Sequence, residues 1–420
     1  MIEKRILASG ARLMLEHFPH VRSVSFGFYV GSGSRHEPER LSGVSHALEH
    51  MIFKGTPTRS AADIAAEMDF IGGHVNAFTT KEATCFYGRA LDSHLPRALA
   101  LMTDIFFNSR LDEEDWQTER GVILEEIGMY EDSPEDLVSE RLYGHVYQNH
   151  PLGRAILGTP ETLTAMTADD LRAHYAAHYR PEHIVVSLAG HYSDEHVAFL
   201  ENAFGALPRR DVGDSVTPPL YHPGLTVREK PIEQNHLCLG FPCPAYGDER
   251  RQVLQVLSGI LGAGMSSRLF QTVREQRGLC YSIYSFAATQ CDAGLFGVYT
   301  ALGRETERQA LELTRDVLRR FIEDGPAPDE VERVREQIKA NILLGLESTS
   351  SRMSHMGQNE LLLGRVPSPD EIIERFDAVT AERVHALARE ILDFDRMSFS
   401  AVGQVDSAEA YHALLAGVGV

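Results

Sequence analysis

The sequence is poor in the features that mark membrane and secreted proteins. No apolar run reaches the roughly 18 residues that a membrane-spanning helix needs. The N-terminal segment lacks the basic stretch, apolar core and small-residue cleavage site of a secretion signal. Cysteine is also scarce, and the five residues are odd in number and widely spaced, which does not fit a disulfide framework. We therefore expect a cytoplasmic protein with free thiols and no membrane contact.

Basic residues are also fewer than acidic ones. The chain has 40 Lys and Arg residues against 60 Asp and Glu residues, which gives a formal net charge of −20 at pH 7. Nucleic-acid binding needs a basic face, so this balance argues against a nucleic-acid partner and favours basic ligands. The 43% of hydrophobic and 24% of charged residues are typical of a globular protein.

The order of the predicted elements indicates an α+β fold rather than a regular parallel one. Period-two alternation predicts strands at 11–17 and 23–30, after which helical and strand-like segments follow in mixed order. Residues 208–223 are charged and proline-rich without periodicity, which is typical of a linker. A chain of 420 residues exceeds one ordinary core, so we predict two domains, 1–207 and 224–420.

The second domain repeats the order of elements of the first, which indicates an internal duplication. Two pairings of the halves, Gly73 with Gly278 and Glu131 with Glu347, allow their polar residues to be compared. The residues that lack a counterpart are His46, Glu49, His50, Glu119 and Glu126, which lie opposite Arg251, Leu254, Gln255, Arg335 and Ile342. Groups that the duplicated half does without are not needed to build the fold, so we expect them to serve chemistry.

The stretch SHALEHMIFKGT, residues 45–56, contains an HxxEH motif in a predicted amphipathic helix. His46 and His50 lie one turn apart on one helix face, where both imidazoles can reach one metal ion. Glu49 lies on the same side of the helix. The apolar residues mark a separate face suited to the core, and they are Val44, Leu48 and Met51. A metal site is one interpretation of the motif, and a solvated polar helix face is the other.

A catalytic zinc site typically has three protein ligands and leaves a fourth position for water. The predicted helix TERGVILEEIGMYE, residues 118–131, offers glutamates for the third position. Glu119 and Glu126 are seven residues apart and share a helix face, whereas Glu125 points elsewhere. The segment alone does not separate a third ligand from an ordinary solvated acidic helix.

Three segments taken together resemble the pitrilysin and insulinase family of zinc peptidases, in particular its processing-peptidase branch in bacteria and mitochondria. These segments are HALEHMIFKGT, NAFTTKEATCFY and ERGVILEEI, and HxxEH is the inverted form of the common zinc-protease motif. The resemblance extends over nearly the whole chain. It implies two similar α+β domains of the processing-peptidase-like metallohydrolase fold, each a mostly antiparallel sheet packed with helices, arranged as a clamshell.

The resemblance also implies the residues of the site. The family places its third ligand 76 residues after the second histidine, and 126 − 50 = 76, so Glu126 would join His46 and His50 around one Zn²⁺ per chain. Glu49 matches the general base that takes a proton from water at the zinc. Glu119 matches a supporting carboxylate beside the site. Manganese or cobalt in place of zinc stays open.

For the substrate, the resemblance implies contacts from both domains. The stretch GGHVNAFTT would form an exposed edge strand to which a peptide adds as a further strand, with Asn76, Ala77 and Phe78 in contact. Arg274 and Tyr281 match a pair that reaches the substrate from the second domain, where the tyrosine hydroxyl could donate to a developing oxyanion. From the residues alone, an inner strand, a helix-capping arginine and a half-buried tyrosine explain the same segments.

The sequence therefore predicts a zinc-dependent endopeptidase that hydrolyses peptides or unfolded segments. The negative charge favours basic peptides, and the resemblance implies a homodimer. Two alternatives stay open. One is a noncatalytic assembly or binding subunit of a processing-peptidase-like complex, and the other is a zinc hydrolase or lyase that does not cleave peptides.

Overall fold

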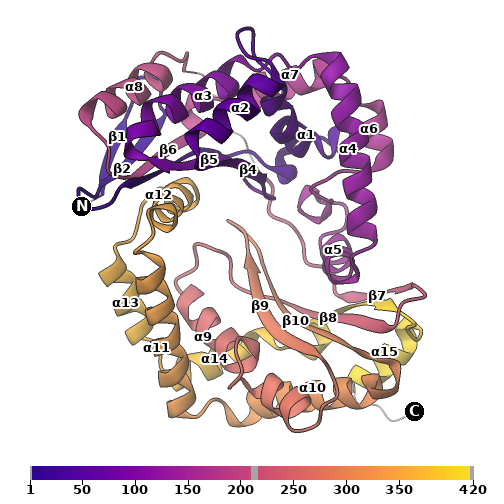
Figure 1. The fold of residues 1–420 in the computed structure, drawn as a ribbon. Helices are drawn as coiled ribbons and strands as arrows, with labels where there is room; N and C mark the ends of the chain where they lie inside the picture. The colour runs from indigo at the N-terminus through magenta and orange to yellow at the C-terminus, as the bar shows by residue number, and fades with distance from the viewer. Residues whose placement is uncertain (1, 210–215, 417–420) are drawn as a thin grey trace. The chain divides into compact units, whose positions relative to one another are not determined.

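A computed structural model describes residues 2–209 and 216–416 of the chain. The described residues divide into two compact units, each with its own sheet and hydrophobic core (Figure 1). Unit 1 comprises residues 2–127, 154–209, 216 and 343–367, and unit 2 comprises residues 128–153, 217–342 and 368–416. Each unit therefore combines residues from both halves of the sequence.

Unit 1 is built on a six-stranded sheet with the strand order β1-β2-β6-β3-β5-β4. Its strands are β1 (Glu3–Ile6), β2 (Arg12–His17), β3 (Ser23–Val30), β4 (His74–Thr79), β5 (Thr84–Leu91) and β6 (Ile184–Gly190). Strands β2 and β6 are parallel, and the other neighbouring strands of this sheet are antiparallel. Strands β1 and β4 form its two edges.

Helices cover both faces of this sheet (Figure 1). The helices of unit 1 are α1 (Val44–Met51), α2 (Ala61–Ile71), α3 (Leu95–Asn108), most of α4 (Glu113–Glu131), α6 (Pro160–Ala165), α7 (Ala168–His178), α8 (Asp194–Gly205) and α12 (Thr349–Leu363). Alternate residues of β3 point into the main core, where the ring of Phe28 lies 5.5 Å from that of Phe106 in α3 and 4.9 Å from that of Phe204 in α8.

The opposite face of the unit 1 sheet is covered by α12, which belongs to the C-terminal half of the sequence (Figure 1). Small residues of β3 let this helix approach closely, because a Cβ added at Gly27 would lie 2.6 Å from Met353 Sδ. Hydroxyl groups line the contact: Ser25 Oγ lies 2.9 Å from Thr349 Oγ1, and Ser187 Oγ donates to the backbone oxygen of Met353 at 2.8 Å. Close packing and hydrogen bonds thus join α12 to this sheet.

Unit 2 is built on a five-stranded sheet with the order β7-β11-β8-β10-β9. Its strands are β7 (Gly224–Glu229), β8 (Gln234–Pro242), β9 (Ser282–Thr289), β10 (Gly294–Gly303) and β11 (Ser398–Gly403). Its helices are α5 (Pro134–Val146), α9 (Arg251–Gly262), α10 (Arg304–Asp324), most of α11 (Pro328–Gly345), α13 (Pro369–Asp377), α14 (Ala381–Ile391) and α15 (Ala408–Ala416).

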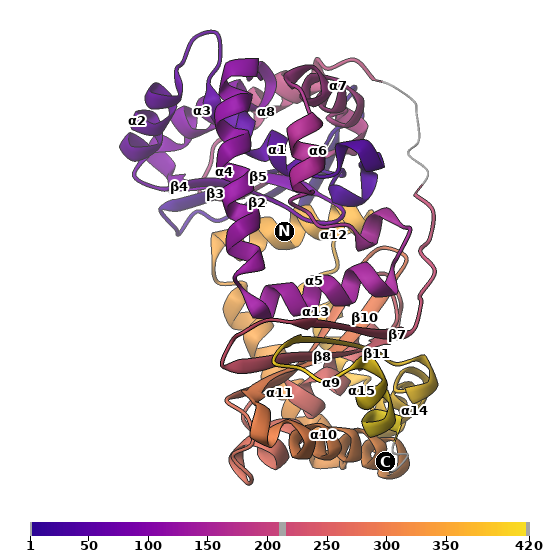
Figure 2. The ribbon, with the colours of Figure 1, turned by 90° about the vertical axis from the view of Figure 1, so that its right-hand side faces the viewer.

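Helix α5, from the N-terminal half of the sequence, lies along one face of the unit 2 sheet (Figure 2). Its apolar residues are buried there, and they are Leu137, Val138, Leu142 and Val146. A Cβ added at Gly240 of β8 would lie 3.0 Å from Leu142 Cδ2, so the helix packs closely on the strand. This contact is mainly apolar, in contrast to the hydroxyl-lined contact of α12.

The two sheets confirm the predicted fold of two similar α+β domains. The order β2-β6-β3-β5-β4 in unit 1 corresponds to β7-β11-β8-β10-β9 in unit 2, and the first pair is parallel in both. The pairing of Glu131 with Glu347 is a shift of 216 residues, which places 134–146 on 350–362, inside α12. Helices α5 and α12 are therefore equivalent, and each covers the sheet of the other half.

The predicted linker, 208–223, includes residues 210–215, which lie outside the described residues. Its remaining residues, 208–209 and 216–223, form no helix or strand. In the part of the chain that the structure describes, no helix is both long enough and apolar enough to cross a membrane.

Candidate metal centre

Helix α1 presents its polar residues on one side because its apolar residues are taken up by a core. Val44, Leu48 and Met51 are fully buried in a cluster that includes residues of α4 and α7. The helix begins after Gly43, whose φ of +97° is a left-handed conformation that favours glycine. Helix α4 packs against α1 through this cluster, which brings its glutamates beside the histidines.

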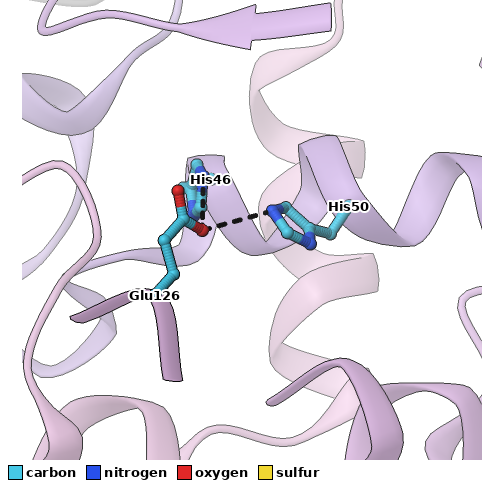
Figure 3. A group of neighbouring side chains, drawn as sticks. All are labelled: His46, His50 and Glu126. Atoms are coloured by element: carbon cyan, nitrogen blue, oxygen red, sulfur yellow. Dashed lines mark ion pairs between the residues drawn. The ribbon is translucent and has the colours of Figure 1, made fainter. Parts of the chain in front are cut away.

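The side chains of His46, His50 and Glu126 converge on one point (Figure 3). Glu126 Oε2 lies 3.7 Å from His46 Nε2 and 3.7 Å from His50 Nε2, and one ligand atom from each residue lies within 4.8 Å of the others. Tetrahedral zinc ligands at about 2 Å from the ion lie about 3.3 Å apart. Two imidazoles and one carboxylate at this spacing fit a zinc ion, and three protein ligands leave its fourth tetrahedral position to a non-protein ligand.

Burial keeps His46 in the form that binds metal. Burial, with a smaller contribution from the neighbouring His50, lowers the pKa of His46 to about 3. The imidazole is therefore neutral at neutral pH, and the lone pair of Nε2 is available to an ion.

His50 is oriented by Glu119 of α4, and Glu119 is held in turn by a lysine. Glu119 Oε2 lies 3.1 Å from His50 Nδ1, and Glu119 Oε1 lies 2.5 Å from Lys54 Nζ. A carboxylate at Nδ1 favours the tautomer that carries its proton there, so Nε2 faces Glu126 as a free ligand atom. Glu119 is buried, and Lys54 supplies the opposite charge that a buried carboxylate needs.

Glu49 lies beside this group and is held by a different partner. The hydroxyl of Thr79, the last residue of β4, donates to Glu49 Oε2 at 2.6 Å. Burial raises the pKa of the Glu49 carboxyl above its ordinary value, and the hydrogen bond from Thr79 acts in the opposite direction. A positioned carboxyl with a raised pKa is suited to accepting and returning a proton.

Strand β4 carries the three residues predicted to contact substrate, and it lies at an edge of the unit 1 sheet. Asn76 and Phe78 are exposed, Ala77 is buried, and the backbone N–H of Ala77 donates to Asn76 Oδ1 at 2.9 Å. The other edge, β1, has the sequence EKRI, and such charged residues discourage the addition of a further strand. Strand β4, HVNAFT, has no Asp, Glu, Lys or Arg, so no side chain of this kind discourages the addition of a further strand.

Arg274 and Tyr281 belong to unit 2 and lie close to each other. Arg274 lies in a π-helical turn, Phe270–Glu275, with its guanidinium carbon 4.6 Å from the Phe270 ring centroid and 5.5 Å from that of Tyr281. Tyr281 directly precedes β9 and is 75% exposed. The alternative in which this tyrosine is half-buried in the sheet is therefore wrong.

The motifs give no role to Lys54 or Thr79, although both residues lie within the segments that carry the family resemblance. Lys54 follows the HxxEH helix within FKGT, and Thr79 follows Phe78 in NAFTT. Their partners are 65 and 30 residues away in the chain (119 − 54 and 79 − 49), so only the fold shows these contacts.

Two family models and several bacterial proteins match the sequence of this chain. The model of the insulinase family, peptidase family M16, matches residues 12–160, and that of the peptidase M16 inactive domain matches residues 165–338. The chain is 45% identical over 395 residues to the uncharacterized zinc protease YmxG of Bacillus subtilis, covering 94% of this chain and 97% of that one. It is 40% identical over 420 residues to the uncharacterized zinc protease SCO5738 of Streptomyces coelicolor, with coverage of 97% and 91%.

Solved structures show the same fold at lower sequence identity. A peptidase M16 inactive domain from Pseudomonas fluorescens superposes with a TM-score of 0.90 at 21% identity, covering 97% of this chain and 98% of that one. A protease from Helicobacter pylori superposes with a TM-score of 0.87 at 20% identity, with coverage of 96% and 99%.

Proposed function

The chain belongs to the insulinase family of peptidases, M16, and from this premise we propose that it is a zinc-dependent endopeptidase. The main support is the convergence of His46, His50 and Glu126 on one point beside the independently held Glu49. The relatives with 45% and 40% identity are named zinc proteases, which agrees with this donor set.

Five residues take part in this proposal: three would hold the ion, one would orient a ligand and one would move a proton. His46, His50 and Glu126 would hold the zinc, and Glu119 would keep His50 in the tautomer that binds it. A bound zinc ion supplies Lewis acidity, which polarises the scissile carbonyl and makes water more acidic. Glu49 would take the proton from the attacking water and return it to the leaving amine.

The peptide would bind along β4. Backbone hydrogen bonds to an edge strand hold any extended sequence, which suits a peptidase that accepts unfolded segments. Asn76 and Phe78 are exposed on this strand and would contact substrate side chains. The backbone N–H of Ala77, which donates to Asn76 Oδ1, would donate to a substrate carbonyl instead. We assign Arg274 and Tyr281 to substrate contact as well, because an exposed phenol beside a guanidinium can donate to a carbonyl or oxyanion.

The decisive experiment uses Glu49→Gln, which keeps the size of the side chain and removes the base. We expect this variant to bind zinc as well as the wild type, measured by metal analysis, and to lose roughly 10²- to 10⁴-fold in peptide cleavage. A wild-type protein that binds zinc and cleaves no peptide would support a noncatalytic subunit instead. Full activity in Glu49→Gln would show that Glu49 is not the general base.

The formal charge of −20 supports a preference for basic peptides. Two peptides that differ only in Lys or Glu at positions flanking the cleaved bond would test this preference at low ionic strength. We expect a higher kcat/KM for the basic peptide and a smaller difference in high salt, because salt screens the interaction. Equal values of kcat/KM for the two peptides would contradict the proposed preference for basic peptides.

A further inference from the structure

The first turn of α1 needs hydrogen-bond acceptors that its own N-cap residue does not supply. The first backbone N–H groups of a helix have no partner within the helix, and an N-cap side chain usually accepts one of them. The N-cap of α1 is Gly43, which has no side chain. Helix α1 has eight residues, too few to be stable without support from outside the helix.

Glu37 supplies the missing acceptors from six residues upstream. Its Oε2 accepts the backbone N–H of Gly43 at 2.8 Å, and its Oε1 accepts the backbone N–H of Ser45 at 2.8 Å. Glu37 is only 3% exposed, so a buried carboxyl group accepts both hydrogen bonds at the N-terminus of α1. When Glu37 is ionised, its negative charge at this end also interacts favourably with the helix dipole.

Neighbouring segments hold Glu37 and this turn in place. A guanidinium nitrogen of Arg154 donates to the backbone oxygen of Glu37 at 2.5 Å. Thr162 Oγ1 donates to the backbone oxygen of Ser42 at 2.8 Å, and a Cβ added at Gly43 would lie 2.7 Å from the backbone oxygen of Leu157. The segment 154–162 therefore packs directly against the start of α1.

We propose that Glu37 is a positioning residue for the metal centre: its carboxylate fixes the first turn of α1 and thereby places His46. This role rests on the proposed zinc site. His46 lies in that first turn, directly after Ser45, whereas His50 lies one turn later and has its own partner in Glu119. A frayed or rotated first turn would move His46 Nε2 away from Glu126, so zinc would lose one of its three ligands.

Helix α2 provides a matched control in the same unit. Its N-cap, Ser60, accepts the backbone N–H of Asp63 at 3.2 Å, so Ser60→Ala also removes a cap. Helix α2 carries none of the proposed zinc ligands. A general loss of stability would therefore affect Glu37 and Ser60 variants alike, whereas a loss of ligand placement would affect only the Glu37 variants.

The experiment measures the zinc dissociation constant of the full chain by competition with a chelator, and the thermal unfolding midpoint of the zinc-free protein. The variants are Glu37→Ala, Glu37→Gln and Ser60→Ala. We expect zinc binding about tenfold weaker in Glu37→Ala, in line with the ~10- to 100-fold cost of removing residues that orient metal ligands. The zinc affinity of Glu37→Gln should lie between those of the wild type and Glu37→Ala, because its amide oxygen accepts one N–H and its amide nitrogen cannot accept the other.

The outcomes separate this role from the proposed function. Ser60→Ala should lower the unfolding midpoint and leave zinc affinity unchanged. Wild-type zinc affinity in a folded Glu37→Ala or Glu37→Gln variant would overturn the role of Glu37, as would equal weakening in Ser60→Ala or failure of both Glu37 variants to fold. A wild-type protein that binds no zinc would instead overturn the proposed function.

Discussion

The hydroxyl of Thr79 lies 2.6 Å from Glu49 Oε2, and it connects the end of edge strand β4 to the proposed general base. The strand that would bind the peptide backbone therefore also orients the group that would move the proton. In the proposed mechanism, the register of the peptide and the position of the base would both depend on this one short segment of chain.

Replacing Thr79 by Val keeps the shape of the side chain and removes the hydrogen bond to Glu49. We expect kcat to fall by about tenfold, a part of the ~10²- to 10⁴-fold that a general base contributes, with little change in KM or zinc content. Thr79→Ser retains the hydroxyl and should recover most of the activity. An unchanged kcat in Thr79→Val would show that Glu49 does not need this partner.

Glu119 should matter for zinc affinity more than its neighbour Glu125. Glu119→Ala removes the carboxylate that orients His50, and we expect zinc to bind roughly 10- to 100-fold more weakly in a chelator competition. Glu125 is exposed on the same helix, so Glu125→Ala is the control and should bind zinc as the wild type does. Similar losses in both variants would indicate a general effect of acidic charge.

The stability of the zinc-free protein should depend on pH through Glu37. Burial raises the pKa of Glu37 to about 7 from 4.5, against the opposing hydrogen bonds from Ser45 and Gly43. Between these values the folded protein retains a proton that the unfolded chain has released, so this group's contribution to stability falls as pH rises and levels off above about pH 7. Glu37→Gln lacks this titration, so its unfolding midpoint should fall less over the same pH range. Parallel pH profiles would contradict the raised pKa.

The close packing of α12 can be tested with two glycines. A Cβ at Gly357 of α12 would overlap the buried ring of Tyr29, so Gly357→Ala should destabilise the protein by about 1–3 kcal/mol. Gly345, at the end of α11, has no atom within 4 Å of an added Cβ, so Gly345→Ala should be neutral or stabilising. Urea unfolding midpoints would distinguish the two. Equal effects would mean that α12 is not closely packed on the sheet.

Local sequence pattern is sufficient for a central strand of the unit 1 sheet and for the helix that carries the two histidines. The alternation in SVSFGFYV predicts β3 with its boundaries, because the two faces of this strand meet different environments. The four-residue spacing of His46 and His50 predicts their common face because α1 is a regular helix. Glu126 needed the family resemblance, because nothing in an acidic helix shows which carboxylate lies near a distant pair of histidines.

Local pattern was not sufficient where distant segments decide the outcome. The sequence does not reveal that α5 and α12 exchange sheets, because the sheet that a helix covers depends on long-range packing. Helix α12 is also hard to recognise, since its buried residues include Gly357, Asn359 and Glu360 besides two methionines. The contacts of Glu37, Lys54 and Thr79 depend in the same way on loops and turns that bring separate segments together.

The exchange of α5 and α12 makes the two halves of this polypeptide mutually dependent. A gene split at the linker would encode two fragments, each holding the helix that shields the other fragment's sheet. Either fragment produced alone would expose an uncovered sheet face and tend to aggregate. Produced together, the two fragments should assemble into one complex with equal amounts of each, so the half that carries the proposed zinc ligands should not fold as an independent domain.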